Sequence, residues 1–201
     1  IGTLRDTLLE ECALSGALFD AVARKPFPTL SDAAGDQMQQ LILQARQQGD
    51  SVGGIVQCAA IGVPAGFGSP DYGCNAEGIF AQQLFAIPAV KGVAFGAGFD
   101  FARLYGSQAN DPYYLDGQQI RTKTNHAGGI NGGITNGMPL LFTAVFRPTP
   151  SIARPQQTVN LQTRQPAEFT ITGRHDPCIV HRAVPVVEAA AALALCQLMN
   201  L

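Results

Sequence analysis

The order of apolar segments along the chain predicts an α/β sandwich in which helices cover antiparallel strands. Three short apolar stretches, 52–63, 89–95 and 140–146, predict buried strands, and prolines mark the bounds of the second and third. Two stretches with apolar residues at helical spacing, 77–86 and 184–201, predict helices that pack on the sheet. The resulting order of strand, helix, strand, strand and helix is the basis for the predicted fold class.

Two further helical segments are predicted before the first strand. Leucines at helical spacing between residues 1 and 25 predict an amphipathic segment that Gly16 interrupts and Pro26 ends. The second helix is predicted to begin after Ser31, which can cap its first turn, and to end at Gly49, which readily adopts a left-handed conformation. Its buried face repeats at helical intervals and consists of Met38, Leu41, Ile42 and Ala45.

The segment 96–137 contains nine glycines and many polar residues, and it predicts a long flexible loop. A loop of that length inside a compact domain is usually functional or disordered. We expect this one to be mobile alone and ordered around a bound ligand. Further along the chain, short strands are predicted at 158–160 and 167–171.

The composition of the 201 residues fits a single domain, 1–201, because 46% of them are hydrophobic and can form a sizeable core. Only 14% are charged, and the formal net charge of −2 includes no basic stripe that would favour nucleic acid. Sparse charge favours a homo-oligomer, in which other subunits cover part of the surface. The longest apolar run, 189–196, is too short to span a bilayer, and no signal-peptide pattern is seen, so no membrane partner is expected.

The cysteines argue against a metal site and against a disulfide scaffold. Their number is odd, their positions are scattered, and none of them has the CxxC spacing of a zinc site. Such usage is typical of a reducing compartment and predicts a cytoplasmic protein. The five are Cys12, Cys58, Cys74, Cys178 and Cys196.

The most reactive combination of side chains lies near the end of the chain, where Arg174, His175 and Asp176 follow one another. Pro177 disfavours helix at the residue before it, so the triplet is predicted to lie on an extended connection. Pro185 suits the first turn of a following helix. A charged loop at the start of a helix can hold an anion. The alternative is that Arg174 and Asp176 only pair with each other.

Five segments of the chain, taken in order, resemble the motifs of the chorismate synthase family, the flavin-dependent lyases that end the shikimate pathway. Matches of this specificity in the same order are very unlikely by chance. The segments are Gly62–Pro70, Ile87–Val93, Asn125–Gly137, Arg147–Ile152 and the stretch from Gly173 to Ala189.

This resemblance implies a fold and a reaction. The implied fold is a β-α-β sandwich in which helices pack on a mainly antiparallel four-stranded sheet, as one half of a pseudo-symmetric core. The implied reaction converts 5-enolpyruvylshikimate 3-phosphate, a small phosphorylated substrate, to chorismate and phosphate, with reduced FMN as cofactor and NADPH as a candidate reductant. A homotetramer in the cytoplasm is implied as well.

The resemblance also implies roles for individual residues. Asp176 is the expected catalytic acid–base group near the flavin, and Arg174 and Asp176 are the expected substrate contacts. His175 and His181 are interpreted as structural histidines, with a catalytic role as the alternative. His126 is interpreted as a loop residue and Cys178 as a small buried residue. The expected cofactor contacts are Pro88, Ala89, Gly132, Arg147, Pro148, Thr149, Pro150, Ser151 and Arg174.

The sequence departs from the family pattern at its beginning. Residues 1–28 match poorly, and the motifs Gly-Glu-Ser-His-Gly and Arg-Ser-Ser-Ala-Arg, together with a second family histidine, do not occur. We therefore expect a truncated enzyme whose isolated chain is not catalytically competent. The alternatives are a non-catalytic module that binds FMN or phosphate through Arg147, Thr149, Ser151 and Arg174, and a purely structural, oligomer-forming fragment.

Overall fold

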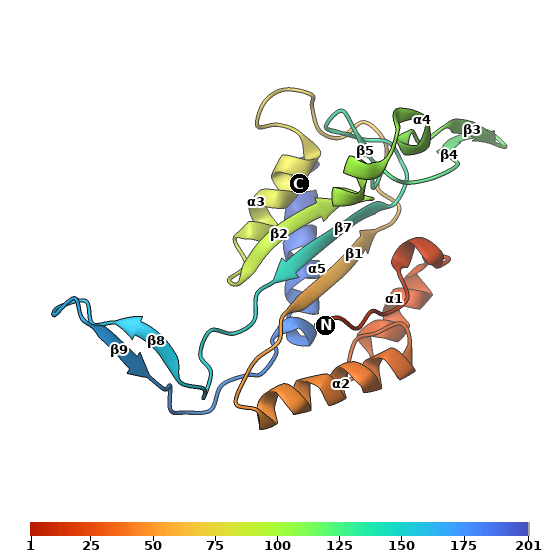
Figure 1. The fold of residues 1–201 in the computed structure, drawn as a ribbon. Coiled ribbons are helices and arrows are strands. Elements are labelled where there is room, and N and C mark those ends of the chain that lie inside the picture. The colour runs from red at the N-terminus through yellow and green to blue at the C-terminus, as the bar shows by residue number, and fades with distance from the viewer. Residues whose placement is uncertain (201) are drawn as a thin grey trace.

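The computed structural model describes residues 1–200, and its central element is an antiparallel sheet of three strands (Figure 1). The strands are β1 (Gly54–Ala60), β2 (Val90–Phe95) and β7 (Leu140–Phe146), in the order β1-β7-β2. Each lies within the stretch where the sequence predicts a strand, and the antiparallel pairing is confirmed. The expected fourth strand is not part of this sheet within residues 1–200, because the remaining strands pair with one another elsewhere.

One face of the sheet is covered by two helices, α3 (Ala76–Phe85) and α5 (Val180–Leu198) (Figure 1). The two helices pack against each other, with α5 against β1 and α3 against β2. Their inner residues and those of β7 form the core, in which Phe80 and Phe142 lie with ring centroids 5.4 Å apart. Helices packed on a mainly antiparallel sheet confirm the predicted fold class.

Helix α5 begins at Val180, four residues before the predicted start at Val184. Pro185 is therefore inside the helix and not in its first turn, where the sequence places it. A proline at this position leaves the carbonyl of His181 without its usual intrahelical partner. The added first turn is nevertheless held by tertiary packing, because Val180 and Ala183 are both buried in the core.

The segment before β1 contains a 3-10 turn, η1 (Leu9–Glu11), and two helices, α1 (Gly16–Ala23) and α2 (Asp32–Gln47). Ser31 caps α2 as predicted, since its hydroxyl accepts a hydrogen bond from the N–H of Ala34. Gly49 adopts the predicted left-handed conformation. The expectation that Gly16 interrupts a helix is wrong, because Gly16 is the first residue of α1 and Ser15 caps that helix.

The sequence predicts a long flexible loop at 96–137, but the segment contains several short helices and strands. The carboxylate of Asp111 accepts hydrogen bonds from the N–H groups of His126 and Ala127 and from the hydroxyl of Thr124, and so ties its two halves together. The sequence lacks long apolar repeats here because the elements are short. They are η2 (Gly98–Arg103), α4 (Gly106–Ala109), the hairpin β3 (Tyr113–Asp116) and β4 (Gln119–Thr122), and the pair β5 (Ile130–Asn131) and β6 (Ile134–Thr135).

A second hairpin, formed by β8 (Gln156–Val159) and β9 (Pro166–Phe169), projects away from the sheet (Figure 1). These strands correspond to the two short strands predicted in this part of the chain, and within the described chain they pair only with each other. None of the helices within residues 1–200 combines the length and the apolar composition that crossing a bilayer requires.

Candidate functional site

Three segments that are distant in sequence meet at the end of the sheet where β1 begins and β7 ends. The segment 46–52 lies between the other two. On one side, the hydroxyl of Ser51 donates to the carbonyl of Thr149 at 2.6 Å, and the N–H of Ala153 donates to Gly49 at 2.9 Å. On the other side, the N–H of Val52 donates to the carbonyl of Pro177 at 2.8 Å. These bonds bring the segments 147–153 and 173–177 together.

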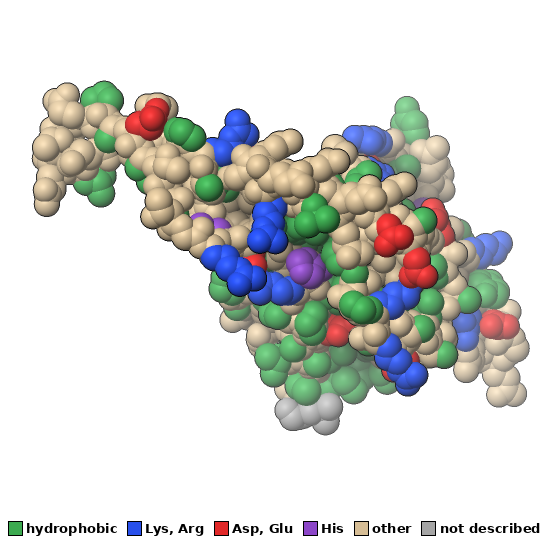
Figure 2. Space-filling view, turned by 90° about the horizontal axis from the view of Figure 1, so that it is seen from below, with side chains coloured by type: hydrophobic (Ala, Val, Ile, Leu, Met, Phe, Trp, Pro, Cys, Tyr) green, Lys and Arg blue, Asp and Glu red, His purple; other side chains and the backbone are tan. Residues whose placement is uncertain are grey.

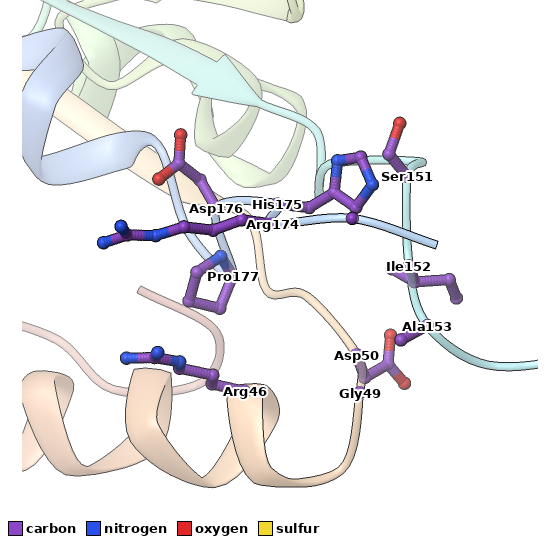
Figure 3. A pocket seen from close by; sticks show the side chains of 11 residues that line it. Arg46, Gly49, Asp50, Ser151, Ile152, Ala153, Arg174, His175, Asp176 and Pro177 are labelled. Carbon is purple, nitrogen blue, oxygen red and sulfur yellow. The ribbon is translucent and has the colours of Figure 1, made fainter. Parts of the chain in front are cut away.

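A cavity of about 200 Å³ opens between these segments (Figure 3). Three predicted site residues, Ser151, Arg174 and Asp176, lie in its wall. This volume is smaller than the about 300–1,000 Å³ that small-molecule sites usually enclose. The complete lining consists of Arg46, Gly49, Asp50, Ser151, Ile152, Ala153, Gly173, Arg174, His175, Asp176 and Pro177.

Two arginines of this cavity have no acidic partner among the residues that the structure describes. Arg46, in the last turn of α2, and Arg174 extend toward the same side, with Pro177 between them (Figure 3). Among residues 1–200, no carboxylate lies within 4.0 Å of either guanidinium. Figure 2 shows several basic side chains beside a histidine at this end of the molecule. Unpaired guanidinium groups that extend to the same side are suited to bind an anion.

Asp176 pairs with Arg182, in the first turn of α5, and not with Arg174. The simple alternative for the triplet, an ion pair between Arg174 and Asp176, is therefore wrong. Both partners of the observed pair are about half exposed, with 58% of the Arg182 side chain and 54% of the Asp176 side chain accessible. The pairing leaves the Arg174 guanidinium available for a ligand.

The segment 147–151 follows β7 and carries most of the predicted cofactor contacts. Arg147, Pro148 and Pro150 are exposed, whereas the hydroxyl oxygen of Thr149 is buried and has no hydrogen-bond partner within residues 1–200. A buried hydroxyl without a partner is costly, so such a group is a natural place for a polar ligand atom. The residues in this segment thus fit a phosphate group.

The predicted contacts Pro88 and Ala89 lie at the same end of the sheet, just before β2. The carbonyl of Ala89 accepts the N–H of Arg147 at 3.0 Å. Ala89 has φ = 73°, a left-handed conformation that costs energy for any residue with a Cβ. Strained backbone of this kind is concentrated at functional sites. Neither residue, however, lines the cavity around Arg174.

Gly132 is the predicted contact that the chain does not bring to this cavity. It lies in the turn between β5 and β6, before β7 begins, whereas Arg147 follows the end of β7. A seven-residue strand spans roughly 23 Å, and this length separates the two ends. Within this chain, the expected cofactor contact Gly132 therefore lies far from the expected contacts Arg147 and Arg174.

A larger cavity, of about 590 Å³, lies at that opposite end of the sheet. Its wall includes Gly96, Lys123 and His126, but none of the predicted cofactor or substrate contacts. The side-chain oxygen of Asn125 in this wall is buried without a partner among the described residues. The larger size of this cavity does not by itself indicate a role in the chemistry predicted for Arg174 and Asp176.

Comparisons with known proteins agree with the motifs found in the sequence. The sequence model of one family, chorismate synthase, matches residues 7–200, and its match begins within the segment 1–28 that we expected to match poorly. The chain belongs to the chorismate synthase family.

Two curated chorismate synthases and one solved structure illustrate the similarity. The chorismate synthase of Dehalococcoides mccartyi is 52% identical over 166 residues, which cover 83% of this chain and 45% of the relative. The chorismate synthase of Archaeoglobus fulgidus is 48% identical over 184 residues, which cover 90% of this chain and 51% of the relative. A crystal structure of a chorismate synthase superimposes with a TM-score of 0.69 at 28% identity, covering 85% of this chain and 44% of that one. The chain thus spans about half the length of the curated relatives it matches.

The titratable groups around this chorismate synthase segment differ in their surroundings. Burial, and then the nearby Arg182, lower the pKa of His181, while Asp176 acts in the opposite direction. The His181 ring stacks on Phe27 with centroids 5.3 Å apart. Burial raises the pKa of the Cys178 thiol, and the residue is only 2% exposed, as expected for a small core residue that is not a nucleophile.

Two cationic residues of the site, Arg46 and Arg182, were not predicted from the sequence. Arg182 carries a weak signal, because it follows Asp176 by six residues at the beginning of a helix. Arg46 carries none, because a basic residue in the last turn of a helix is ordinary. Only the folding of the segment 46–52 between the other two segments brings Arg46 to the cavity.

Proposed function

We propose that this chain forms the C-terminal half of a chorismate synthase, a lyase that converts 5-enolpyruvylshikimate 3-phosphate to chorismate and phosphate. In this proposal residues 1–201 act as one domain of the enzyme. One observation carries the proposal: Ser151, Arg174 and Asp176 belong to two separate family motifs, yet they line one cavity together with Arg46. Neither arginine has an acidic partner within residues 1–200.

The arginines of the cavity would bind the anionic groups of the substrate. Arg174 and Arg46 extend to the same side and are both free of carboxylates within the described chain. Charge-assisted hydrogen bonds from guanidinium groups to phosphate are strong and geometrically specific. The same bonds would stabilise the charge that accumulates on the phosphate as it leaves.

Asp176 would act in proton transfer. It is the one carboxylate of the predicted site, it is accessible, and it lies two residues from Arg174. A general acid or base has to reach the proton that it moves, and an exposed carboxylate beside the anion-binding arginines meets that condition.

Reduced FMN would supply the electron-rich ring on which the elimination of phosphate depends, with no net oxidation or reduction of the substrate. The residues that fit its phosphate are Arg147, Thr149 and Ser151, because the buried Thr149 hydroxyl lacks a partner in residues 1–200. Pro88 and Ala89 would contact it through their backbone. Gly132 remains a predicted contact, without support from its position in this chain.

We further propose a homotetramer in the cytoplasm, with NADPH as a candidate reductant of the flavin. The projecting β8–β9 hairpin (Figure 1) supports the oligomer, since a soluble surface rarely leaves a group of large apolar side chains uncovered. Its exposed residues Val159, Leu161 and Phe169 have 55%, 88% and 43% of their surface accessible.

The test is a chimeric enzyme in which this chain replaces the 166 matched residues of the Dehalococcoides mccartyi relative. We expect the chimera to form chorismate from 5-enolpyruvylshikimate 3-phosphate with reduced FMN. We expect the 201-residue chain alone to give no turnover. An Arg174→Gln variant of the chimera serves as the control and should raise KM. A folded chimera that binds FMN and yet forms no chorismate would contradict the proposal and favour a non-catalytic FMN-binding or oligomer-forming role.

A further inference from the structure

We propose that Arg182 is a positioning residue, which holds the carboxylate of Asp176 in the orientation required for proton transfer. This inference rests on the proposed function, because it assigns a role to Arg182 in the same site. It divides the arginines of the site into two groups. Arg174 and Arg46 serve the substrate, and Arg182 serves the catalytic carboxylate.

Asp176 needs such a partner because its own segment does little to fix it. The residues between Gly173 and Ile179 form neither helix nor strand. The backbone there is anchored through the carbonyl of Pro177, and the Asp176 side chain remains 54% exposed. A half-exposed carboxylate samples several rotamers unless a contact selects one. Within residues 1–200, the hydrogen bond from the Arg182 guanidinium to Asp176 Oδ2 is its only recorded side-chain partner.

Arg182 is well placed to provide that contact, because its backbone is rigid. Its N–H bonds to the carbonyl of Ile179 at 3.1 Å in the first turn of α5. Its neighbours Val180 and Ala183 are 3% and 7% exposed, so the turn is fixed in the core. A planar guanidinium on a fixed turn orients a carboxylate better than a flexible ammonium group does.

The other cations near Asp176 do not take this role. Arg174 is only two residues away, yet it extends from the loop without forming an ion pair with the carboxylate (Figure 3). The ring of His181 stacks on Phe27, and it makes no recorded hydrogen bond to Asp176 among the described residues. Binding of an anionic substrate to Arg174 therefore leaves the contact between Arg182 and Asp176 intact.

The experiment compares four variants of the chimeric enzyme: Arg182→Gln, Arg182→Lys, Arg174→Gln and Arg121→Gln. Arg121 is the matched control, because it pairs with Asp116 at an exposure similar to that of the Arg182–Asp176 pair. The Arg121 side chain is 49% exposed and the Asp116 side chain 58%, and both lie in a hairpin at the opposite end of the sheet. We expect Arg182→Gln to lower kcat by about 10- to 100-fold, as misplacement of a catalytic group does, with KM and the Kd for FMN within about twofold. Arg182→Lys should recover part of kcat, Arg174→Gln should mainly raise KM, and Arg121→Gln should change neither.

Crystal structures of the chimera and its Arg182→Gln variant give a readout that is independent of activity. We expect one conformer of Asp176 in the parent and several, or a displaced one, in the variant. If Asp176 stays in place and KM rises as in Arg174→Gln, Arg182 is a substrate ligand and the inference is overturned. An unchanged kcat with an unchanged Asp176 overturns it as well. If the chimera itself lacks turnover, the proposed function fails, while the two crystal structures still test Arg182. Should Arg182→Gln not fold, the Arg182→Lys variant tests the inference, because its ammonium group should hold Asp176 less well and leave kcat below that of the parent; a kcat and an Asp176 conformer equal to those of the parent would overturn it.

Discussion

The two ends of the central sheet are built in different ways. At the end where α5 begins, the segments that carry Ser151, Arg174 and Asp176 are held by a few hydrogen bonds, and their charged side chains remain accessible. At the opposite end, the turns of the segment 96–137 are packed backbone against backbone. The N–H of Gly96 bonds to the carbonyl of Leu141 at 2.9 Å, and the N–H of Leu141 bonds to Gly128 at 3.1 Å.

This difference changes the interpretation of the glycine-rich segment. A Cβ on Gly128 would lie 2.5 Å from the nitrogen of Gly96 and 2.6 Å from the oxygen of Leu141, so this glycine is required by packing. At Gly132 a Cβ would meet no atom of the described residues within 4 Å. Glycines in one motif therefore serve two purposes: most allow the chain to fold closely on itself, and Gly132 leaves open space that a ligand or another chain could approach.

The largest expected effect is a loss of stability at the end of the sheet where the segment 96–137 packs. Gly128→Ala should lower the free energy of unfolding by more than about 4 kcal/mol, because its Cβ would overlap backbone atoms that cannot move aside and its φ is 65°. Gly132→Ala should cost only about 1–2 kcal/mol, from its left-handed φ of 58°. Urea unfolding of the two variants measures the difference. Equal losses would mean that the two glycines do not differ in purpose.

At the end of the sheet that carries Arg174 and Asp176, the charged end, the largest effect is expected on turnover. Asp176→Asn keeps the shape of the side chain and can still accept a hydrogen bond from Arg182, but it cannot exchange a proton as a carboxylate does. In the chimeric enzyme we expect kcat to fall by about 100-fold or more, with the Kd for FMN nearly unchanged. Steady-state kinetics and flavin titration give the two numbers. A parallel loss of both would make Asp176 a scaffold residue.

Asp111 offers a test of the hydrogen bonds that hold the segment 96–137. Burial by itself would raise the pKa of this carboxyl, but the N–H of Ala127, the hydroxyl of Thr124 and the N–H of His126 together lower it below its ordinary value. Asp111→Ala should therefore cost about 1–3 kcal/mol at neutral pH, since it leaves these donors without their acceptor.

The pH dependence of Asp111 follows from the same lowered pKa. The stabilisation is fully present above the ordinary pKa of an aspartate, about 3.9, and is lost as the pH falls through the lower folded value. Unfolding curves between pH 3 and pH 7 should thus show a smaller acid-dependent loss in Asp111→Ala than in the parent. The same slope in both proteins would contradict this role.

The smallest expected effect concerns His181 at the charged end. Its folded pKa is lowered, first by burial and then by Arg182, so the folded chain favours the neutral imidazole. The unfolded chain binds the proton more readily, and stability should therefore decrease as the pH falls from about 6.5 toward the folded value. His181→Phe keeps an aromatic ring against Phe27 and should remove this part of the pH dependence, as thermal unfolding at pH 5 and pH 7.5 can measure. His175→Phe, at an exposed position of the same segment, is the control.

Local patterns predicted the elements that follow a simple rule. β7 occupies the predicted residues because apolar side chains fill both of its faces between Pro139 and Pro148. α2 begins where Ser31 caps it. The start of α5 and the short elements within 96–137 were missed, because they are stabilised by contacts with residues far away in the sequence and not by local periodicity.

The sequence by itself determined the family of this chain, its main strands and helices, and the identity of the reactive triplet. The tertiary structure decided which partner each charge has. In the folded chain Arg46 lies beside Arg174, Asp176 pairs with Arg182, and Gly132 lies at the other end of the sheet. The physical reason is that hydrogen bonds between the segment 49–52 and segments roughly 100 and 125 residues later assemble the site, and no local pattern encodes such distant contacts.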